Sequence, residues 1–515
     1  MTDEGDVLDL IPAWRQSAGV SVAVLPDDWG RAVDAQGVLG VPVMTPVQAP
    51  SWLGPDTEAL RAAGFGGDVG DVLMYPGAGG GTVALYGAGA AEAADAHALR
   101  DAAAAFASAV SGHDRLTLVL PQSTAVAPEL AAQALVEGVL LARYRYPLLK
   151  AEDPAAPDLQ EVRLLASAEQ LDPAARGAER GRLLARTQNL ARDLASCPPS
   201  VMTAEALADC AVRLADECGF TAEVFDRAAL ERLGCGGLLG VNAGSADEPR
   251  MVKLAYTPSG SSSGGGSGGR LALVGKGIMY DSGGISLKPS DAVHATMKND
   301  MSGAGAILAA MTVLRALDCP TTVTAWLMCT DNMPSGSATK LGDVLTFRGG
   351  STCEVINTDA EGRLVMADAL VLATEEPGDA IVDIATLTGA SLRALGPEIA
   401  AVFGNAQPLV DQVLAAAGRS DEPAWQLPLA RRYRKELDSD IADIKNMGGP
   451  SGGAIHAALF LEEFVAGRDW AHIDIAGPAQ NDAAKSWHPR GCTGYGARLL
   501  TELALGFTRS PGVTE

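Results

Sequence analysis

The stretch RLALVGKGIMYDSGG, residues 270–284, opens with an apolar run and closes in glycines. The run RLALVG, residues 270–275, lacks the polar and apolar alternation of a strand with one face in water. A strand of this kind is buried on both faces, so it belongs inside a sheet that helices cover on both sides. Parallel sheets place their sites on loops after the carboxyl ends of their strands. We expect a Gly-rich loop after this strand, and it supplies Lys276, Asp281 and Lys288 as candidate residues of a functional site.

Apolar strands and helices alternate along the rest of this half of the chain. Strands are predicted at residues 251–256, 321–330, 380–387 and 470–477, and helices at about 302–317, 362–374 and 455–466. Because most of these strands are continuously apolar, we predict an α/β fold whose central sheet is largely parallel and sandwiched by helices.

The N-terminal third of the chain shows a second, smaller α/β pattern, with strands and helices predicted at residues 20–25, 82–87, 90–110, 115–121 and 128–143. A chain of 515 residues is too long for one core, since single cores stop growing at about 250–300 residues. Residues from about 176 to 196 read as one long helix, which ends before a proline pair because proline cannot continue it. We predict an N-terminal α/β domain over residues 1–175 and a C-terminal catalytic domain over residues 176–515, with residues 176–196 as a linker helix.

Composition and charge narrow the class of protein. Hydrophobic residues make up 47% and charged residues 20%, which is typical of a globular protein with a sizeable core. The net charge of −24 repels phosphate backbones and anionic membranes, which argues against nucleic acid as a partner. We find no signal-peptide pattern at the start of the sequence and no run of the ~18 apolar residues that a membrane span needs. The eight cysteines are scattered and form no CxxC pair, which indicates reduced thiols, so we expect a cytoplasmic protein.

The stretch SGSSSGGGSGG, residues 259–269, contains only glycine and serine. Such a stretch cannot bury surface or hold one conformation. It is either a mobile lid or a tolerated insertion in a surface loop. We favour the insertion, because long loops cost little in closure entropy.

Four acidic side chains in the C-terminal half lie where a strand or loop gives way to glycine or to a helix: Asp281, Asp300, Asp359 and Glu361. A carboxylate at a helix N-terminus can simply cap the helix, a contribution of about 0.3–1 kcal/mol. The segment INTDAEGRL, residues 356–364, holds two acids and Arg363, which is more than a cap requires. If the four carboxylates converge, they need cations or shifted pKa values. Shared oxygen ligands suit two divalent ions such as Mn²⁺, Mg²⁺ or Zn²⁺.

Two other kinds of site are excluded by residue spacing. The pair Gly275-Lys276 is not part of a Walker phosphate-binding loop, because Arg270 stands where that pattern needs glycine and Gly277 where it needs serine or threonine. The six histidines are dispersed and form no HExxH motif, which excludes a zincin.

Six segments resemble, in order and spacing, the signature segments of the leucyl (cytosol) aminopeptidases: VGKGIMYDSGGISLKP, MKNDMSGAGAIL, DNMPSGSATKLGD, NTDAEGRLVMADAL, DIATLTGA and WAHIDIAG. The resemblance covers about residues 180–505. It implies a catalytic domain with a mixed, mainly parallel central sheet flanked by helices, and a homohexamer of two stacked trimers. It also implies a dinuclear-metal exopeptidase that acts on peptides with a free N-terminus.

The resemblance further implies a role for each site residue. One metal ion, Mn²⁺ or Zn²⁺, would be held by Asp281, Asp359 and Glu361, and the other by Lys276, Asp281, Asp300 and Glu361. The catalytic pair would be Lys288 and Arg363, with a bicarbonate held by the arginine as a proton shuttle. The pocket for the first side chain would be bordered by Met297, Thr386, Leu387 and Cys492, although each of these also fits an apolar core.

We therefore expect a cytosolic aminopeptidase that releases leucine or other apolar N-terminal residues through a hydroxide activated by two metal ions. A DNA-binding or scaffold role, in addition to or instead of peptidase activity, is the alternative, against which the net charge and the complete set of ligands argue. Two-metal phosphoryl transfer would account for the carboxylates but would leave Lys276 unexplained as a ligand.

Overall fold

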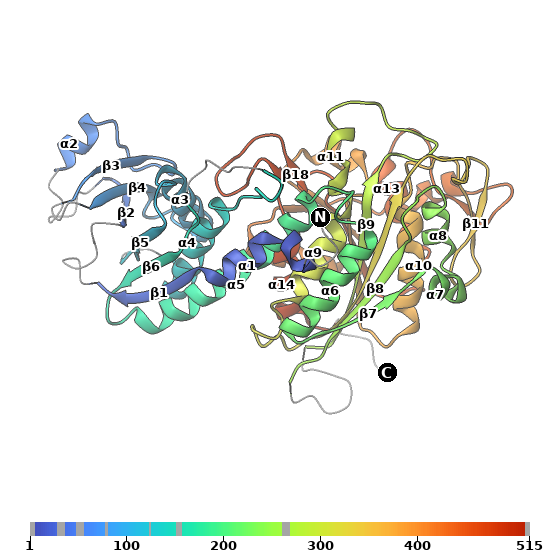
Figure 1. Ribbon diagram of the computed structural model, residues 1–515, viewed down its shortest axis with the longest axis horizontal. Helices are drawn as coiled ribbons and strands as arrows, with labels where there is room; N and C mark the ends of the chain where they lie inside the picture. Colours follow the sequence, from blue (N-terminus) through green and yellow to red (C-terminus); the bar gives the residue numbers. More distant parts are fainter. Residues whose placement is uncertain are drawn as a thin grey trace. The chain divides into compact units, whose positions relative to one another are not determined.

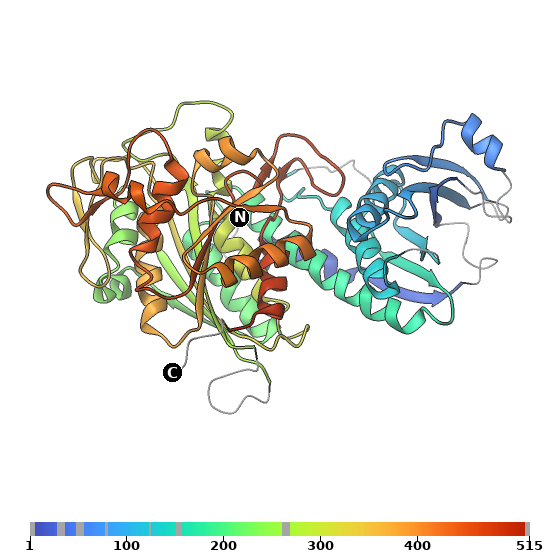
Figure 2. The same cartoon turned by 180° about the vertical axis from the view of Figure 1, so that it is seen from behind.

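The computed structural model describes residues 6–27, 37–47, 56–77, 81–122, 125–150, 157–259 and 268–509. The chain forms two compact units, which Figures 1 and 2 show from opposite sides. The larger unit comprises Met1–Ile11, Leu190–Asn481 and Gly491–Glu515, and the smaller unit comprises Pro12–Asn189 and Asp482–Arg490. The division falls inside the long helix α5, Leu171–Ser196, which begins a few residues earlier than the sequence predicts.

The smaller unit is built on one six-stranded sheet. Its strands are β1 (Ser21–Pro26), β2 (Val38–Thr45), β3 (Val72–Pro76), β4 (Thr82–Ala90), β5 (Arg115–Val119) and β6 (Glu161–Ala166). They lie in the order β1-β6-β5-β2-β4-β3, and all neighbours are parallel except β3 and β4. The helices are α1 (Pro12–Gly19), α2 (Thr57–Ala62), α3 (Ala96–Ala109) and α4 (Pro128–Ala142), besides the first part of α5.

Helices α3 and α4 of the smaller unit pack closely because Gly138 has no side chain. A Cβ at Gly138 would lie 2.3 Å from the carbonyl oxygen of Arg100. The same helices share a buried ion pair, with 2.6 Å between Arg100 Nε and Glu137 Oε2. Trp487, from the short segment Asp482–Arg490, packs into this core. We find no candidate chemistry in this unit among the residues that the structure describes.

The larger unit has an eight-stranded sheet in the order β15-β14-β17-β13-β9-β10-β8-β7. The strands are β7 (Thr221–Phe225), β8 (Arg250–Tyr256), β9 (Arg270–Asp281), β10 (Thr322–Asn332), β13 (Ala380–Ala385), β14 (Ala400–Gly404), β15 (Ala424–Gln426) and β17 (Trp470–Asp474). The central strands β17, β13, β9 and β10 are parallel, and antiparallel pairs occur toward both edges. The predicted mixed, mainly parallel sheet is therefore confirmed.

Helices cover both faces of this sheet (Figure 1). The helices are α6 (Ala204–Cys218), α7 (Arg227–Leu233), α8 (Gly236–Asn242), α9 (Ser302–Met311), α10 (Gly362–Glu375), α11 (Gly389–Leu395), α12 (Gln407–Ser420), α13 (Gly453–Glu462) and α14 (Ala497–Gly506). One face carries α6, α9 and α14, and the other carries α8, α10 and α13. On the second face, the core includes Val274, Trp326, Leu364 and Phe460, so the apolar runs of the sequence meet between the sheet and α10.

The remaining elements are short. They are the 3₁₀ helices η1 (Val7–Leu10), η2 (His294–Met301) and η3 (Arg431–Leu437), a three-stranded sheet of β11 (Val344–Thr346), β12 (Thr352–Glu354) and β16 (Ile444–Lys445), and the pair β18 (Gln480–Asn481) and β19 (Gly491–Cys492). Helix α9 ends at Met311, earlier than the predicted 317. Most of the Gly/Ser stretch 259–269 lies outside the described residues, which stop at 259 and resume at 268.

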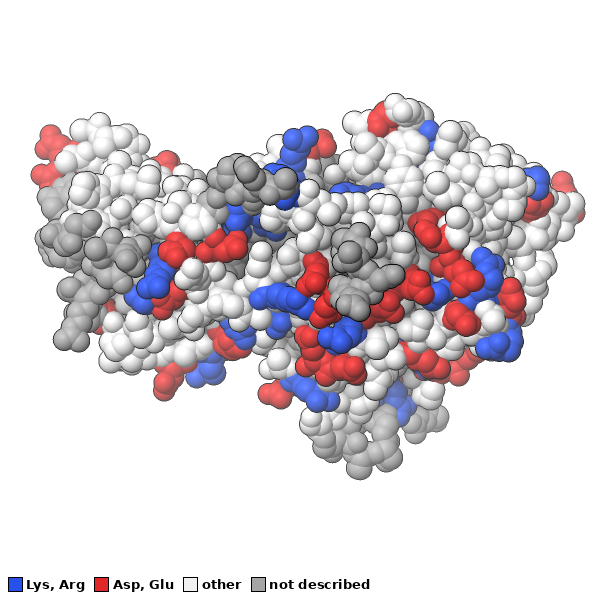
Figure 3. Space-filling model, viewed as in Figure 1, with Lys and Arg blue, Asp and Glu red and all other residues white. Residues whose placement is uncertain are grey.

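Most of the cysteines lie in the interior, and the face drawn in Figure 3 carries charges of both signs. None of the eight cysteines forms a disulfide within the described part of the chain, and all but Cys218 are buried. Within the described ranges, no helix is both long and apolar enough to cross a bilayer. On the face drawn in Figure 3, the described basic side chains are interspersed with acidic ones and form no broad basic patch.

Candidate metal centre and active site

Strand β9 carries two of the candidate ligands, which corrects one prediction. Lys276 and Asp281 were expected on a Gly-rich loop, but β9 runs from Arg270 to Asp281 and includes both. The pairing of β9 with β10 continues as far as Asp281 and Asn332, across a register shift between Thr330 and Asn332. The glycines inside β9 serve close packing rather than a turn, since a Cβ at Gly275 would lie 2.8 Å from Ala304 Cα on α9 and one at Gly277 would lie 2.8 Å from Met328 O on β10.

Asp281, at the end of β9, is held by neighbours on three sides. Its Oδ1 accepts hydrogen bonds from Gly283 N at 2.9 Å and from Asn332 Nδ2 at 2.8 Å. Its Oδ2 lies 2.7 Å from Lys288 Nζ. The carboxylate is buried, and burial together with the charge of Glu361 raises the pKa of Asp281 to about 6.

Lys276, Asp300 and Glu361 form a buried cluster beside Asp281. Lys276 Nζ lies 2.8 Å from Asp300 Oδ2 and 2.7 Å from Glu361 Oε1. It also donates to the carbonyl oxygen of Thr386 at 2.8 Å. One carboxylate oxygen from each of Asp281, Asp300 and Glu361 lies within 4.8 Å of the others. The three acids that the sequence places far apart therefore converge.

Helix capping does not account for these acids. Glu361 occupies the N-cap position of α10, but its side chain makes no capping hydrogen bond. Asp300 lies in η2, and the N-cap of α9 is Met301. The acids therefore need an explanation other than the ends of the helices.

Asp359 lies on the other side of Lys288. Lys288 Nζ is 2.5 Å from Asp359 Oδ1, and the Asp359 side chain is 35% exposed. The turn that carries Asp359 is fixed from behind by Asn446, whose Oδ1 accepts from Ile356 N at 2.9 Å and whose Nδ2 donates to Asn357 O at 2.7 Å. Each of the two lysines thus contacts two carboxylates.

The charges of this cluster perturb one another strongly. Burial acts to lower the pKa of Lys276, but Asp300, Glu361 and Asp281 together raise it well above its ordinary value. Burial raises the pKa of Asp300. Burial would also raise the pKa of Glu361, but Lys276 and Lys288 outweigh it and lower that pKa. Strongly perturbed carboxylates and lysines in one cavity are characteristic of functional sites.

Arg363, two residues after Glu361, is buried at 6% exposure. Its Nε and Nη1 have no hydrogen-bond partner among the residues that the structure describes. Burial lowers the pKa of Arg363 to about 10. A buried guanidinium with two unused donors is suited to a small anion, because its planar fork binds an oxyanion through two parallel hydrogen bonds.

The cluster opens into a cavity of about 910 Å³. Its lining includes all seven candidate ligands and catalytic residues as well as Met297, Thr386 and Leu387. Cys492 does not line it; this thiol is buried elsewhere and donates to Ala195 O at 3.2 Å. The other walls are largely apolar, including Leu427, Met447 and Ile455.

The sequence-based reasoning missed several residues that hold the site together. Asn332 donates to Asp281 and also to Thr358 O at 2.9 Å, so it joins β10 to the turn before Glu361. Asp474, at the end of β17, accepts from Thr388 Oγ1 at 2.6 Å and from Leu387 N at 3.2 Å. Their signal in the sequence is a polar residue that ends an apolar strand.

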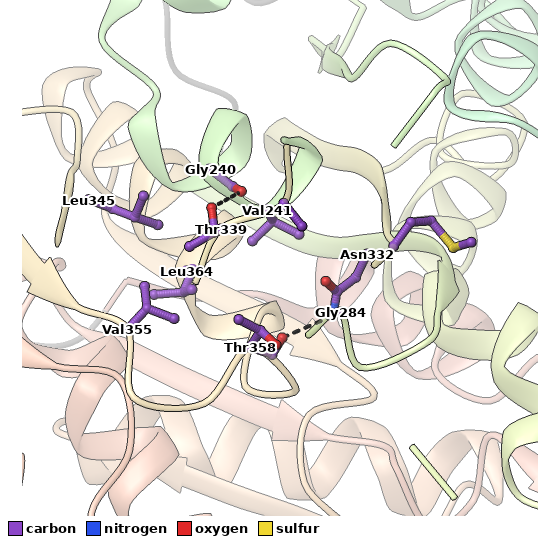
Figure 4. A pocket seen from close by; sticks show the side chains of 11 residues that line it. Gly240, Val241, Gly284, Asn332, Thr339, Leu345, Val355, Thr358 and Leu364 are labelled. Atoms are coloured by element: carbon purple, nitrogen blue, oxygen red, sulfur yellow. Dashed lines mark hydrogen bonds between the residues drawn. The ribbon is translucent and has the colours of Figure 1, made fainter. Parts of the chain in front are cut away.

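A second, much smaller pocket lies behind Asn332, with a volume of about 10 Å³ (Figure 4). Apolar side chains such as Val241, Val355 and Leu364 line it beside Asn332 and Thr358. Room for about one water and an apolar wall make this pocket a packing feature rather than a substrate site.

The residues present fit divalent cations. Four carboxylates face two ammonium groups in the cluster. Glu361 Oε2 is buried and accepts no hydrogen bond from any described residue. Buried carboxylate oxygens without donors are what Mn²⁺, Mg²⁺ and Zn²⁺ bind, because the cation supplies the missing charge compensation.

Comparison with known proteins identifies the family. Residues 189–501 match the cytosol aminopeptidase family, catalytic domain, and residues 56–153 match the N-terminal domain of the same family. The chain belongs to the cytosol aminopeptidase family. It is therefore a metal-dependent aminopeptidase, a hydrolase that acts on peptides.

Relatives of this aminopeptidase include a probable cytosol aminopeptidase of Streptomyces avermitilis, 45% identical over 87% of this chain and 88% of that protein. Another, of Chlorobaculum tepidum, is 44% identical over 74% of this chain and 76% of that protein. Among solved structures, the bottromycin maturation enzyme BotP in complex with Mn is similar with a TM-score of 0.83 and 38% identity. That similarity covers 92% of this aminopeptidase and 99% of BotP.

Proposed function

We propose that this aminopeptidase releases single N-terminal residues, preferably leucine or another apolar residue, with two divalent ions in the cluster described above. The observation that carries the proposal is the convergence of Asp281, Asp300 and Glu361 in the lining of a cavity whose other walls are largely apolar. The acids supply the ligands and the cavity supplies room for a side chain.

The same cluster divides into two sets of ligands. One ion would be held by Asp281, Asp359 and Glu361, and the other by Asp281, Asp300, Glu361 and Lys276, which would ligate as the neutral amine after the ion displaces its proton. Mn²⁺ and Zn²⁺ are the candidates, and the similar enzyme BotP forms a complex with Mn. When bound, the ions would supply Lewis-acid activation of water and an anchor for the free α-amino group of the substrate.

Lys288 would act on the scissile carbonyl. It lines the cavity, its side chain is 17% exposed, and Asp281 and Asp359 hold its ammonium group from two sides. Although burial acts to lower its pKa, Asp281 and Glu361 raise the pKa of Lys288, which keeps it positively charged at neutral pH. An ammonium held in this way would donate to the oxyanion that develops on the carbonyl oxygen.

Arg363 would hold a bicarbonate that moves the proton. No carboxylate in the cluster is left over as a general base, because all four serve as ligands in this proposal. The two donors of Arg363 that lack partners among the described residues are available for such an anion.

Substrate preference would follow from the cavity walls. Met297, Thr386 and Leu387 would border the pocket for the first side chain, and an apolar side chain would be favoured there because it loses no hydrogen bonds on burial. We also propose peptides with a free N-terminus as substrates, a cytoplasmic location and a homohexamer.

Hydrolysis of leucyl p-nitroanilide by the purified protein tests this proposal. Activity should require Mn²⁺ or Zn²⁺ and should be lost in Glu361→Gln, which keeps the shape of the side chain but removes its charge. The matched control is Glu502→Gln, since Glu502 is also buried but lies on α14 and pairs with Arg419. Full activity in excess chelator, or in Glu361→Gln, would reject the proposal.

A further inference from the structure

One charged side chain of the cavity has no role in the function proposed above. Arg393, on helix α11, lines the cavity together with the candidate ligands, Lys288 and Arg363. All other charged residues of the lining belong to the centre itself. Arg393 is therefore the one charged group of the lining that lies outside the centre, among the residues that the structure describes.

The guanidinium of Arg393 lies toward the beginning of α11. Arg393 belongs to the last turn of this helix, but side chains on a helix point toward its N-terminus. Its Nη1 lies 3.3 Å from the position that a Cβ on Gly389 would occupy. Gly389 opens α11 and follows closely after Thr386, whose Oγ1 donates to Asp300 Oδ1 at 2.7 Å. The guanidinium thus lies at the end of α11 that leads to the candidate centre.

Arg393 lacks an acidic partner within the described ranges. It is exposed and forms no ion pair or hydrogen bond with any residue in the described part of the chain. By contrast, Lys276 and Lys288 each contact two carboxylates. The five donors of the Arg393 guanidinium therefore face the cavity and solvent without an anion.

A peptide substrate carries one obligatory anion, its C-terminal carboxylate. With a net charge of −24, the protein as a whole repels anions, so a local cation is needed to hold a carboxylate near the centre. The guanidinium fork matches a carboxylate in geometry. We propose that Arg393 binds the C-terminal carboxylate of short peptide substrates and makes the enzyme favour them over the corresponding peptide amides. This inference rests on the aminopeptidase function proposed above.

The geometry also bounds the reach that a substrate needs. The chain from Thr386 to Gly389 covers at most about 11 Å, and each residue of an extended peptide adds about 3.3–3.6 Å. About three extended residues therefore span this stretch even at its longest, so short peptides can carry their carboxylate as far as Gly389, beside which the guanidinium lies.

The test measures kcat/KM for a series of peptides, from Leu-Gly to Leu-Gly-Gly-Gly-Gly, each with a free carboxylate and as the amide. The acid-to-amide ratio of kcat/KM is the readout. In Arg393→Gln the ratio should fall by about fivefold at the peptide length for which the wild-type ratio is highest. A change of about fivefold corresponds to the largest contribution that an exposed ion pair usually makes. Arg393→Lys should retain part of the preference, and Arg393→Glu should reverse it. In the wild type, 0.5 M NaCl should lower the ratio, because salt screens an exposed ion pair.

Arg432→Gln is the matched control, because Arg432 is an exposed arginine of η3 outside the cavity lining. It should leave the acid-to-amide ratio unchanged. Equal ratios in wild type and Arg393→Gln at every length would overturn the inference while leaving the proposed function intact. This outcome includes the case in which kcat/KM falls by the same factor for acids and amides. Failure of the wild type to cleave any peptide of either series would reject the proposed function, and the inference with it.

Discussion

Asn332 offers the sharpest test of how the candidate centre is held. Its side-chain amide donates to Asp281 Oδ1 at 2.8 Å and to Thr358 O at 2.9 Å, and all three groups are buried. Asn332→Ala removes both donors, which leaves Asp281 Oδ1 with only the hydrogen bond from Gly283 N and leaves Thr358 O without its side-chain donor. We expect a less stable protein in which Asp281 is also less well oriented for metal binding.

The magnitude follows from the two hydrogen bonds. A bond to a charged acceptor contributes about 1.5–3 kcal/mol and a neutral one about 1 kcal/mol, so the free energy of unfolding should fall by about 3 kcal/mol. A change of this size lowers Tm by about 6 °C for a domain of several hundred residues. Loss of a residue that orients a ligand typically weakens metal binding by about 10- to 100-fold.

The measurements are thermal unfolding and calorimetric titration with Mn²⁺. Asn405→Ala is the control, since Asn405 also makes two hydrogen bonds, to Arg468 O at 2.9 Å and from Trp470 N at 2.8 Å, but neither partner is a candidate ligand. It should lower Tm by a similar amount and leave Mn²⁺ affinity unchanged. If Asn332→Ala binds Mn²⁺ as tightly as Asn405→Ala does, the reasoning about Asp281 is wrong.

Four further outcomes are expected. Lys288→Met should lower kcat by about 10²- to 10³-fold, the usual cost of losing one oxyanion donor, with metal content unchanged by elemental analysis. Removal of metal by EDTA should abolish peptidase activity and lower Tm. Addition of Mn²⁺ at 100 times its Kd should restore activity and raise the free energy of unfolding by about 2.7 kcal/mol, as measured in unfolding scans. Gly275→Ala should destabilise the protein by about 1–3 kcal/mol in urea unfolding, since the new Cβ would lie 2.8 Å from the backbone of α9. Gly418→Ala on α12 should instead stabilise it by about 0.5–1 kcal/mol, because no atom lies within 4 Å of the new Cβ. Burial raises the pKa of Asp368 to about 7, so the fold favours the protonated carboxyl. As the pH rises from about 4 to 7, the free energy of unfolding of the wild type should therefore fall by up to about 4 kcal/mol relative to that of Asp368→Asn. Equal pH profiles of unfolding for the two proteins would contradict this.

The sequence predicts those parts of the fold that depend on burial. Most of the predicted strands and helices occur, because continuous apolar runs have no stable place except inside a covered sheet. The error at residues 276–281 has a physical cause. Glycine and lysine suggest a loop, but here Gly277 lies against the backbone of the neighbouring strand β10, and Lys276 contacts carboxylates in the interior.

The supporting residues of the site are not predictable from one sequence. Asn332 and Asp281 are 51 residues apart, Asn446 and Ile356 are 90 apart, and their pairing depends on which strands become neighbours. A polar residue at the end of an apolar strand has the same local pattern whether it faces solvent or holds a ligand. From residue chemistry alone, the four acids of the candidate centre were predictable only as a group, because their number exceeds what capping requires.

The segment Asp359 to Arg363 explains why so many charges stand together before a buried helix. Asp359 lies 2.5 Å from Lys288, and Glu361 lies 2.7 Å from Lys276. Two acids separated by a single residue therefore contact both lysines of the centre. Arg363 then enters α10, where its neighbours Leu364 and Val365 are fully or almost fully buried. Because the core fixes the start of α10, it also fixes the directions in which the acids and the guanidinium point. Within five residues the chain therefore presents an acid that pairs with Lys288, an acid that pairs with Lys276, and a buried guanidinium.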